Sequence, residues 1–137
     1  MRVVLDTNVV ASAVLWGGTP RLLLEAAREG RLELFTSIAM LAELADILVR
    51  PKFARKIAAS TLTVDQLVEG YAQLASVVRP MSTPRIAPDP DDDVVIGTAL
   101  AAKAEIVVTG DKPLLAVNAY QGVKIVGIAH AIQVLAA

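Results

Sequence analysis

Carboxylates occur in the sequence at places where a metal-dependent reaction could be carried out. Asp6 and Asp111 each follow a short run of bulky apolar residues, and Asp91-Asp92-Asp93 precedes a segment with helical periodicity. Mg²⁺ and Mn²⁺ prefer oxygen ligands, and they bind through a few carboxylates while keeping waters for contact with a substrate. These acids therefore predict a site for a divalent cation, provided that folding brings them together.

The elements that must position these acids alternate along the chain between two kinds of pattern. Short β-branched runs with the length of strands recur between longer segments of helical periodicity. The expected strands are residues 2–5, 32–35, 106–109 and 123–126. This alternation predicts an α/β fold with a mostly parallel central sheet of four or five strands, flanked by helices on both faces in three layers.

The segments between the expected strands carry signals for helices. Helices are expected from about residue 9, over residues 20–28, 37–50 and 63–77, from residue 94 onward and at the C-terminal end. Residues 79–93 contain four prolines and are predicted to form an extended connection. A chain of 137 residues without an internal repeat suits one hydrophobic core, so residues 1–137 are expected to form a single domain.

The expected fold has a consequence for the acids. In a parallel sheet the carboxyl ends of the strands and the N-termini of the following helices lie along one edge, so the acids near positions 6, 92 and 111 can converge there. Each acid taken alone could instead cap a helix or complement its dipole. Three separate caps need not share an edge, however, and clustered like charges oppose folding unless a cation or a basic partner compensates them.

Glu43 is a fourth candidate, on the helix expected over residues 37–50. On this helix Asp46 can form an i, i+4 ion pair with Arg50, whereas Glu43 lies one turn from the like charge of Asp46. An ion pair on the exposed surface of the helix therefore accounts for the presence of Asp46, but it does not account for Glu43. An isolated Glu on a helix is usually just solvated, and that alternative stays open for Glu43.

The composition disfavours several other kinds of site. The chain contains no Cys and a single His, His130, which leaves no thiolate nucleophile and few ligands for zinc. His130 is expected on the surface near the start of the last helix, and no Gly-x-Ser-x-Gly motif supplies a serine nucleophile. No stretch has the form of a secretory signal or a membrane span. A cytoplasmic location without contact to a membrane is expected, consistent with the lack of Cys.

Four short motifs resemble those of the PIN-domain nucleases, and especially of the ribonuclease toxins of bacterial and archaeal toxin–antitoxin pairs. The motifs are Asp6-Thr7-Asn8 after the first strand, Thr36-Ser37 leading to Glu43-Leu44, the stretch from Asp92 to Leu100, and Val107-Val-Thr-Gly-Asp111. They occur in the right order in a chain of the right size, which makes their combination more specific than any one of them. The resemblance covers nearly the whole chain.

The resemblance implies an acidic quartet that acts in catalysis, namely Asp6, Glu43, Asp92 and Asp111. The three aspartates would be the ligands of Mg²⁺ or Mn²⁺, and Glu43 would hold a water of the ion or a second cation. Asn8 and Thr109 correspond to supporting polar residues of the family. The register of the third aspartate leaves two choices, so Asp93 is kept as a supporting residue or as an alternative ligand to Asp92.

The activity that this resemblance implies is hydrolysis of RNA phosphodiester bonds by a Mg²⁺- or Mn²⁺-dependent endoribonuclease. It also implies a toxin that is neutralised by a cognate antitoxin protein, and a homodimer. A second interpretation is a catalytically slow PIN-like module whose acidic pocket receives a basic segment of a partner. A phospho-acceptor receiver domain also clusters acids at a sheet edge, but it needs an Asp at the end of a mid-chain strand, and Asp46 lies in a helical pattern instead.

The charge of the chain bears on RNA as a partner. Thirteen Lys and Arg stand against fourteen Asp and Glu, which is unusual for a nucleic-acid binder, although four acids gathered in one pocket would leave ten acids against thirteen bases elsewhere. The densest basic run is predicted to bind RNA phosphates, or else to be a solvated helix face, and it comprises Arg50, Lys52, Arg55 and Lys56. Phe53 is expected to be a core or partner contact. Trp16, beside Gly17-Gly18, could be a partner contact, but a Trp of this kind is more often largely buried, so Trp16 is expected to be buried and outside the site.

Overall fold

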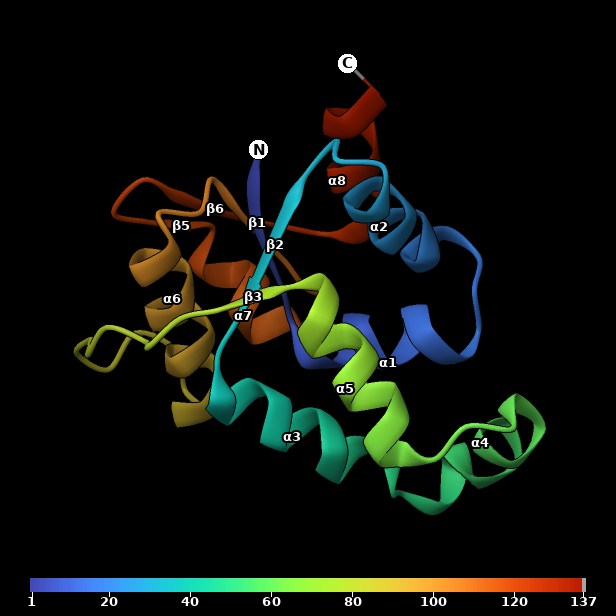
Figure 1. The fold of residues 1–137 in the computed structure, drawn as a ribbon. Helices are drawn as coiled ribbons and strands as arrows, with labels where there is room; N and C mark the ends of the chain where they lie inside the picture. Colours follow the sequence, from blue (N-terminus) through green and yellow to red (C-terminus); the bar gives the residue numbers. More distant parts are fainter. Residues whose placement is uncertain (137) are drawn as a thin grey trace.

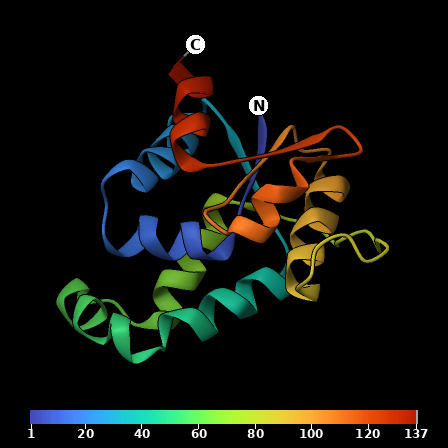
Figure 2. The same cartoon turned by 180° about the vertical axis from the view of Figure 1, so that it is seen from behind.

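A six-stranded sheet in the order β3-β2-β1-β4-β6-β5 runs through the computed structural model, which describes residues 1–136. Helices cover both faces of this sheet (Figures 1 and 2). The strands are β1 (Arg2–Leu5), β2 (Glu33–Thr36), β3 (Ser76–Val77), β4 (Ile106–Val108), β5 (Ala119–Tyr120) and β6 (Val123–Val126). The helices are α1 (Thr7–Leu15), α2 (Thr19–Arg28), α3 (Ile38–Leu48), the 3₁₀ helix η1 (Pro51–Phe53), α4 (Ala54–Ser60), α5 (Val64–Leu74), α6 (Pro90–Ala102), α7 (Lys112–Val117) and α8 (Ile128–Ala136). None of these helices has the length and apolar content needed to cross a bilayer.

The predicted α/β class is confirmed. Every pair of neighbouring strands is parallel except β5 and β6. Two strands of two residues each were not predicted, so the sheet has six strands rather than four or five. The helix expected over residues 63–77 ends at Leu74, and the chain continues as the edge strand β3. A tight turn at Gln121 and Gly122, which both have positive φ angles, connects β5 to β6, and β6 runs back antiparallel to β5.

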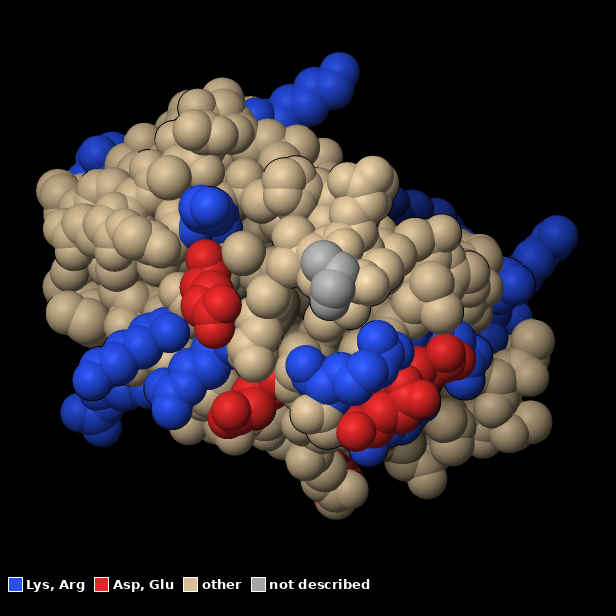
Figure 3. All heavy atoms as spheres, turned by 90° about the horizontal axis from the view of Figure 1, so that it is seen from above, with Lys and Arg blue, Asp and Glu red and all other residues tan. Residues whose placement is uncertain are grey.

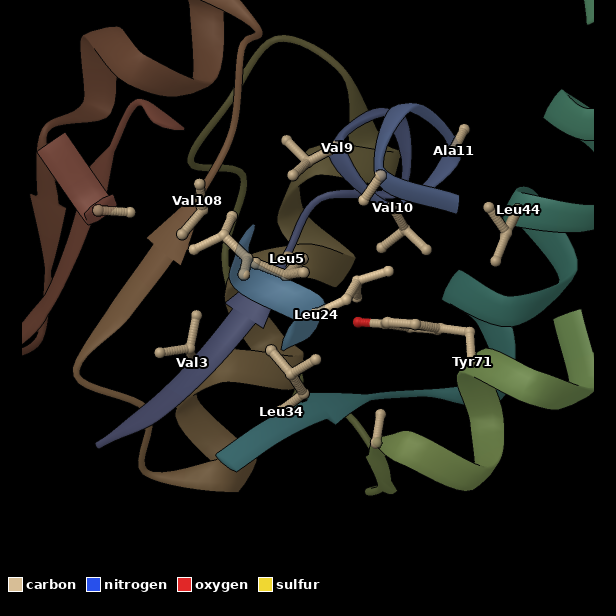
Figure 4. Packing of buried hydrophobic residues seen from close by; sticks show 14 of the residues in the cluster. Val3, Leu5, Val9, Val10, Ala11, Leu24, Leu34, Leu44, Tyr71 and Val108 are labelled. Atoms are coloured by element: carbon tan, nitrogen blue, oxygen red, sulfur yellow. The ribbon is translucent and has the colours of Figure 1, made fainter. Parts of the chain in front are cut away.

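The sheet separates two layers of buried apolar side chains, as the three-layer prediction requires. Because side chains alternate along a strand, Val3 and Leu5 of β1 face one layer and Val4 faces the other. Helices α1, α2, α3, α5 and α8 contribute to the first layer, and Figure 4 shows Val10 of α1 and Leu44 of α3 within it. Helices α6 and α7 cover the second layer. The strands are therefore held from both sides, and their carboxyl ends are fixed.

Helix α6 begins earlier than expected. The extended connection was predicted to reach residue 93, but the helix starts at Pro90, and Asp89 caps it by accepting a hydrogen bond from the backbone N–H of Asp91 at 3.0 Å. The first turn of α6 therefore contains Asp91, Asp92 and Asp93. Proline is well suited to this first turn because its missing N–H has no partner there in any case.

Residues 79–89, the proline-rich segment, lie against α6. The backbone N–H of Met81 donates a hydrogen bond to the carbonyl of Gly97 at 3.0 Å. Farther along, the backbone N–H groups of Ile86 and Ala87 donate to Oδ1 of Asp93, at 3.1 and 2.8 Å. The segment is thus tied to α6 at two places, beside the acids of its first turn.

Helix α3 agrees with the prediction at its start and differs at its end. Ser37 caps it by accepting a hydrogen bond from the backbone N–H of Met40 at 3.4 Å. The helix ends at Leu48, and Arg50 has an extended backbone conformation. The predicted ion pair between Asp46 and Arg50 is therefore wrong, because Arg50 is no longer on the helix. In residues 1–136 the ion pair that forms is that of Arg31 with Glu29.

Candidate active site

A cleft of about 190 Å³ opens at the edge of the sheet where the neighbouring parallel strands β1 and β4 end. The chain leaves these two strands toward opposite faces of the sheet, and ligands of open α/β folds bind at such a point. Its wall consists of Asp6, Asn8, Glu43, Pro88, Asp89, Asp91, Asp92, Asp111 and Pro113. A second hollow of about 210 Å³ lies between α1, α2 and α5, but none of the residues 1–136 that line it carries a carboxylate. The structure thus brings the four acids of the predicted quartet to one cleft.

Asp6 is the most buried of these acids, with 4% of its surface exposed. It lies between β1 and α1 and caps the helix, because its Oδ1 accepts a hydrogen bond from the backbone N–H of Thr7 at 2.8 Å. Its Oδ2 accepts a hydrogen bond from the hydroxyl of Thr109 at 2.7 Å. Both oxygens are held in place, so capping and a place in the cleft are not alternatives for this residue.

Thr109, a predicted supporting residue, connects two of the acids. Its fully buried hydroxyl donates to Asp6 and accepts a hydrogen bond from the backbone N–H of Asp111 at 3.0 Å. Asp111 in turn caps α7, since its Oδ2 accepts a hydrogen bond from the backbone N–H of Leu114 at 3.1 Å. One hydroxyl group therefore sets the positions of Asp6 and Asp111 relative to each other.

Glu43 reaches the cleft from the middle of α3. Leu44 and Ile47 of the same helix are buried in the core, which leaves Glu43 half-buried at the border of the packed face. Burial raises the pKa of Glu43, the Thr7 side chain acts in the opposite direction, and the charge of Asp6 raises it further. The solvated role that was open for Glu43 therefore does not describe its surroundings.

Asp92, and not Asp93, is directed to the cleft. Asp93 accepts the two hydrogen bonds from Ile86 and Ala87, so its carboxylate holds the proline-rich segment. Asp92 is half-buried and lines the cleft together with Asp111. Of the two choices that the sequence left open, the geometry favours Asp92 as the acid that could contact a cation.

Asp89 also lines the cleft, although it was not among the predicted site residues. The signal that could have identified it is the pair Asp89-Pro90, because Asp is favoured at the N-cap of a helix and Pro at the next position. Asp91, which was considered only as part of the acidic triplet, is a further wall residue. The cleft is therefore more acidic than the predicted quartet.

The carboxyl groups of the cleft raise one another's pKa. Burial is the largest cause for Asp6, followed by the opposing hydrogen bonds from Thr109 and Thr7, and the charge of Asp111 adds to the rise. Burial is also the largest cause for Asp92, and the charges of Asp111, Asp6 and Asp89 together with a hydrogen bond to Asp111 bring its pKa to about 7. A cation bound among these groups would relieve the repulsion.

The donor set of the cleft fits Mg²⁺ or Mn²⁺. Its polar wall residues offer only oxygen donors apart from the amide of Asn8, and none of its described wall residues is Lys, Arg or His. Within residues 1–136 no three carboxylate or imidazole groups lie close enough to form a complete ligand cluster by themselves. This is compatible with Mg²⁺, which usually binds through one or two carboxylates and keeps several waters. The residues present therefore fit a hydrated divalent ion better than a fully protein-coordinated one.

We expect Asp92→Asn to stabilise the metal-free protein at pH 8 and to have little effect near pH 4. The carboxyl has an ordinary pKa of 3.8 and a pKa of about 7 in the fold. Between these values the unfolded chain releases the proton of Asp92 while the folded chain retains it, so the folded state loses stability as the pH rises and stays weakened above the upper value. Asn removes this penalty.

Thermal melts in chelator from pH 4 to pH 8 measure the effect, which should reach several degrees in Tm at the upper end. Asp65→Asn, in the first turn of α5 and outside the cleft, is the matched control. Added Mg²⁺ should then raise the Tm of the wild type more than that of Asp92→Asn. Equal melting curves for wild type and Asp92→Asn throughout this range would mean that the acids do not repel one another in the fold.

The charge of the molecule is divided between the cleft and the remaining surface. Six of the fourteen acids line the cleft, which leaves eight against thirteen Lys and Arg elsewhere. On the face seen in Figure 3, acidic side chains lie beside basic ones instead of gathering together. The predicted basic run is exposed on η1, α4 and the residue before them, and it consists of Arg50, Lys52, Arg55 and Lys56. The run thus follows directly on the helix that carries Glu43.

Two aromatic residues near the basic run have different surroundings. Phe53 is 5% exposed and belongs to the core, as one of the two expectations for it stated. The expectation that Trp16 is largely buried is wrong, because 46% of its surface is exposed. Trp16 is the C-cap of α1, and Gly17 and Gly18 follow with φ angles of 68° and 69°, so the chain turns away and leaves the indole uncovered. His130 is exposed in the first turn of α8, as expected.

Comparison with known proteins adds the family. A family model described as PIN domain matches residues 2–113 of the chain. No curated protein matches the chain. The matched region contains every acid of the cleft, and the mostly parallel sheet flanked by helices is consistent with that family.

Proposed function

Since this chain belongs to the PIN-domain family, whose members are typically nucleases, we propose that it is a Mg²⁺- or Mn²⁺-dependent endoribonuclease that hydrolyses RNA phosphodiester bonds. The observation that carries the proposal is the meeting of Asp6, Glu43, Asp92 and Asp111 in one cleft whose described wall includes no basic residue. A cluster of this kind suits a cation that contacts phosphate oxygens, because such a cation would neutralise both the acids and the substrate.

The residues proposed to hold the cation, either directly or through its bound waters, are Asp6, Asp92 and Asp111. Bound there, the ion would stabilise the charge that develops on the phosphate and the leaving oxygen, and it would make a water more acidic. Thr109 orients the carboxylate of Asp6 through its hydroxyl, and partners of this kind influence how well a ligand holds its ion. The exposed Asn8 is proposed to support the substrate at the rim of the cleft.

Glu43 is proposed to position the attacking water. Its carboxylate would accept a hydrogen bond from this water and take up the proton that leaves it. The raised pKa of Glu43 favours this role, because a carboxylate with a higher pKa is a stronger base at its Oε atoms. Asp93 is proposed to act only indirectly, by holding the proline-rich segment against α6.

The biological setting is also part of the proposal. We propose a toxin that acts in the cytoplasm, that is neutralised by a cognate antitoxin protein and that forms a homodimer, on the basis of the resemblance of its motifs to such toxins. Exposed apolar side chains beside the edge strand β3 support the dimer, and they include Ile38, Val77 and Met81. In a monomer these apolar side chains are in contact with water, which is unfavourable, and a second copy packed against them would remove them from water.

Cleavage of a generic single-stranded RNA tests the proposed activity. The purified protein is first treated with chelator and then receives Mg²⁺ or Mn²⁺, and the products are resolved by length. We expect no cleavage in chelator and internal cleavage after either metal is returned. Cleavage in excess chelator would contradict the metal dependence, and failure to cut any RNA with either metal would favour the slow module whose acidic pocket binds a basic partner segment.

A further inference from the structure

The exposed indole of Trp16 lies on a supported aromatic surface. Its ring contacts that of Phe53 with the centroids 5.0 Å apart and the planes inclined by 57°. Phe53 is anchored in the core, and the ammonium group of Lys52 lies 5.0 Å from the centroid of its ring. Trp16 is therefore held on one side and open to solvent on the other, which is the arrangement of an aromatic platform.

The surroundings of this platform are basic. The chain contains no Asp or Glu from residue 47 to residue 64, and the whole basic run falls in that interval. Arg50, Arg55 and Lys56 are exposed, and in the described part of the chain none of them forms an ion pair. A half-exposed Trp beside unpaired cations has the two features with which proteins bind single-stranded nucleic acid, namely a face for a base and charges for phosphates.

The platform and the cleft belong to the same pair of helices. Helices α1 and α3 run side by side in the same direction (Figures 1 and 2). Asp6 and Asn8, at the start of α1, line the cleft, and Trp16 is the C-cap at the other end of this helix, about 14 Å farther along its axis. Similarly, Glu43 lies in the middle of α3, and the basic run begins just after its end. A strand that leaves the cleft along this helix pair would reach the platform.

The acidity of the cleft makes such a second contact necessary. Six carboxylates repel a phosphodiester, so the cleft by itself cannot supply the affinity for RNA even when a divalent ion offsets part of the charge. Affinity for a nucleic acid comes mainly from neutralised phosphates. The basic run offers these charges nearest to Trp16, and a base in a duplex would not be free to stack on the indole.

We propose that Trp16, supported by Phe53, stacks on a base of single-stranded RNA while Arg50, Arg55 and Lys56 bind the neighbouring phosphates, so that the strand extends along α1 and α3 into the cleft. This inference rests on the proposed function, because it takes RNA as the substrate. It adds the platform and the requirement that the RNA be single-stranded.

Trp16 is the only Trp in the chain, so its fluorescence reports on the platform directly. The experiment uses the Asp6→Asn variant, to limit cleavage, and titrates it with a ten-nucleotide oligouridylate and with an adenylate–uridylate duplex of the same length. We expect saturable quenching by the single strand and little quenching by the duplex. Quenching of equal size by the duplex would overturn the single-strand requirement.

Variants measure the contribution of stacking to binding. In the Asp6→Asn background, Trp16→Ala should weaken binding of labelled oligouridylate by about tenfold or more, and Trp16→Phe should weaken it less, because a phenyl ring still stacks. Arg55→Gln should weaken binding and make it less sensitive to salt. Leu22→Ala is the matched control, because it also removes exposed apolar surface, 44% exposed in this case, on α2 and away from the basic run.

Failure of this inference can be told apart from failure of the proposed activity. One outcome is that the wild type cuts RNA with Mg²⁺ although RNA does not quench the fluorescence of Trp16 and Trp16→Ala binds RNA as tightly as its parent. In that case the proposed platform is wrong and the proposed nuclease activity stands. If RNA quenches Trp16 and Trp16→Ala binds weakly while the wild type cuts no RNA with either metal, the platform stands and the nuclease is wrong.

Discussion

Asp6→Asn should abolish metal-dependent RNA cleavage, with a loss of at least about a hundredfold, while the protein stays folded. Asn is as good an N-cap as Asp, so its side-chain oxygen can still accept the hydrogen bond from the N–H of Thr7. The Thr109 hydroxyl can accept from the new amide instead of donating to the carboxylate. What disappears is the negative charge at the centre of the cleft. Rates with saturating Mg²⁺ measure this loss, and circular dichroism confirms the fold.

Asp46→Asn is the matched control for this substitution. Asp46 lies on the same helix as Glu43 and is exposed in a neighbouring hollow, outside the wall of the cleft. It removes the same charge from nearly the same region, so a general electrostatic effect on RNA binding would appear in both variants. We expect Asp46→Asn to cleave RNA almost as well as the wild type. If Asp6→Asn did the same, Asp6 would be a capping residue and the cleft would have another purpose.

Gly97→Ala should destabilise the protein, although Ala is ordinarily the better helix residue by about 1 kcal/mol. A Cβ atom at position 97 would lie 2.3 Å from the backbone carbonyl oxygen of Met81 and 3.5 Å from Cβ of Pro80. The proline-rich segment would have to move away from α6, with a cost of about 1–3 kcal/mol and a fall in Tm of about 4–10 °C. Because the segment is also tied to Asp93, cleavage activity should decrease as well.

Gly70→Ala is the control, since it makes the same change in the middle of α5. Among residues 1–136, no atom outside the helix's own neighbouring backbone lies within 4 Å of a Cβ atom at position 70. Helix propensity alone then decides the result, and a gain of up to about 1 kcal/mol is expected. Thermal unfolding of both variants beside the wild type gives opposite signs if the close approach of the segment to α6 exists. A Gly97→Ala protein that melted higher than the wild type would show that α6 and the segment are not in contact there.

The fold class and the meeting of the acids followed from local patterns. Each long strand is an apolar run bounded by turn residues, and Asp6 and Asp111 lie just past the ends of two such runs. Parallel geometry then dictates that residues after strands share an edge, whatever else the fold contains. This is why acids from distant parts of the sequence could be grouped before their distances were known.

The start of α6 was harder to predict, because the prolines of the preceding segment favour extended backbone and obscured the cap. The choice between Asp92 and Asp93 depended on tertiary contacts. Asp93 turns away from the cleft since the chain folds back and presents the N–H groups of Ile86 and Ala87 to it. No periodic pattern in the sequence predicts that the segment containing Ile86 and Ala87 folds back against α6. The strand β3 was missed for a similar reason, because two residues become a strand only when β2 is beside them.

The exposure of Trp16 also depended on the arrangement of distant parts. Large apolar side chains are usually buried, so the type of residue favoured a place in the core. Its actual exposure follows from the two left-handed glycines after it and from Phe53, which belongs to a segment nearly forty residues later and covers only one side of the indole. A sequence pattern cannot tell which side of a ring a distant segment will cover.

The hydrogen bond between Thr109 and Asp6 spans 103 positions of the chain. A nascent polypeptide therefore cannot assemble the cleft until the fourth strand and the residues just past it have emerged from the ribosome. Before that point the first acid is already present, but its partner strand is not. Under the proposed function, the protein would then be unable to cut RNA during most of its own translation, and a truncated product of the message would carry Asp6 without Thr109.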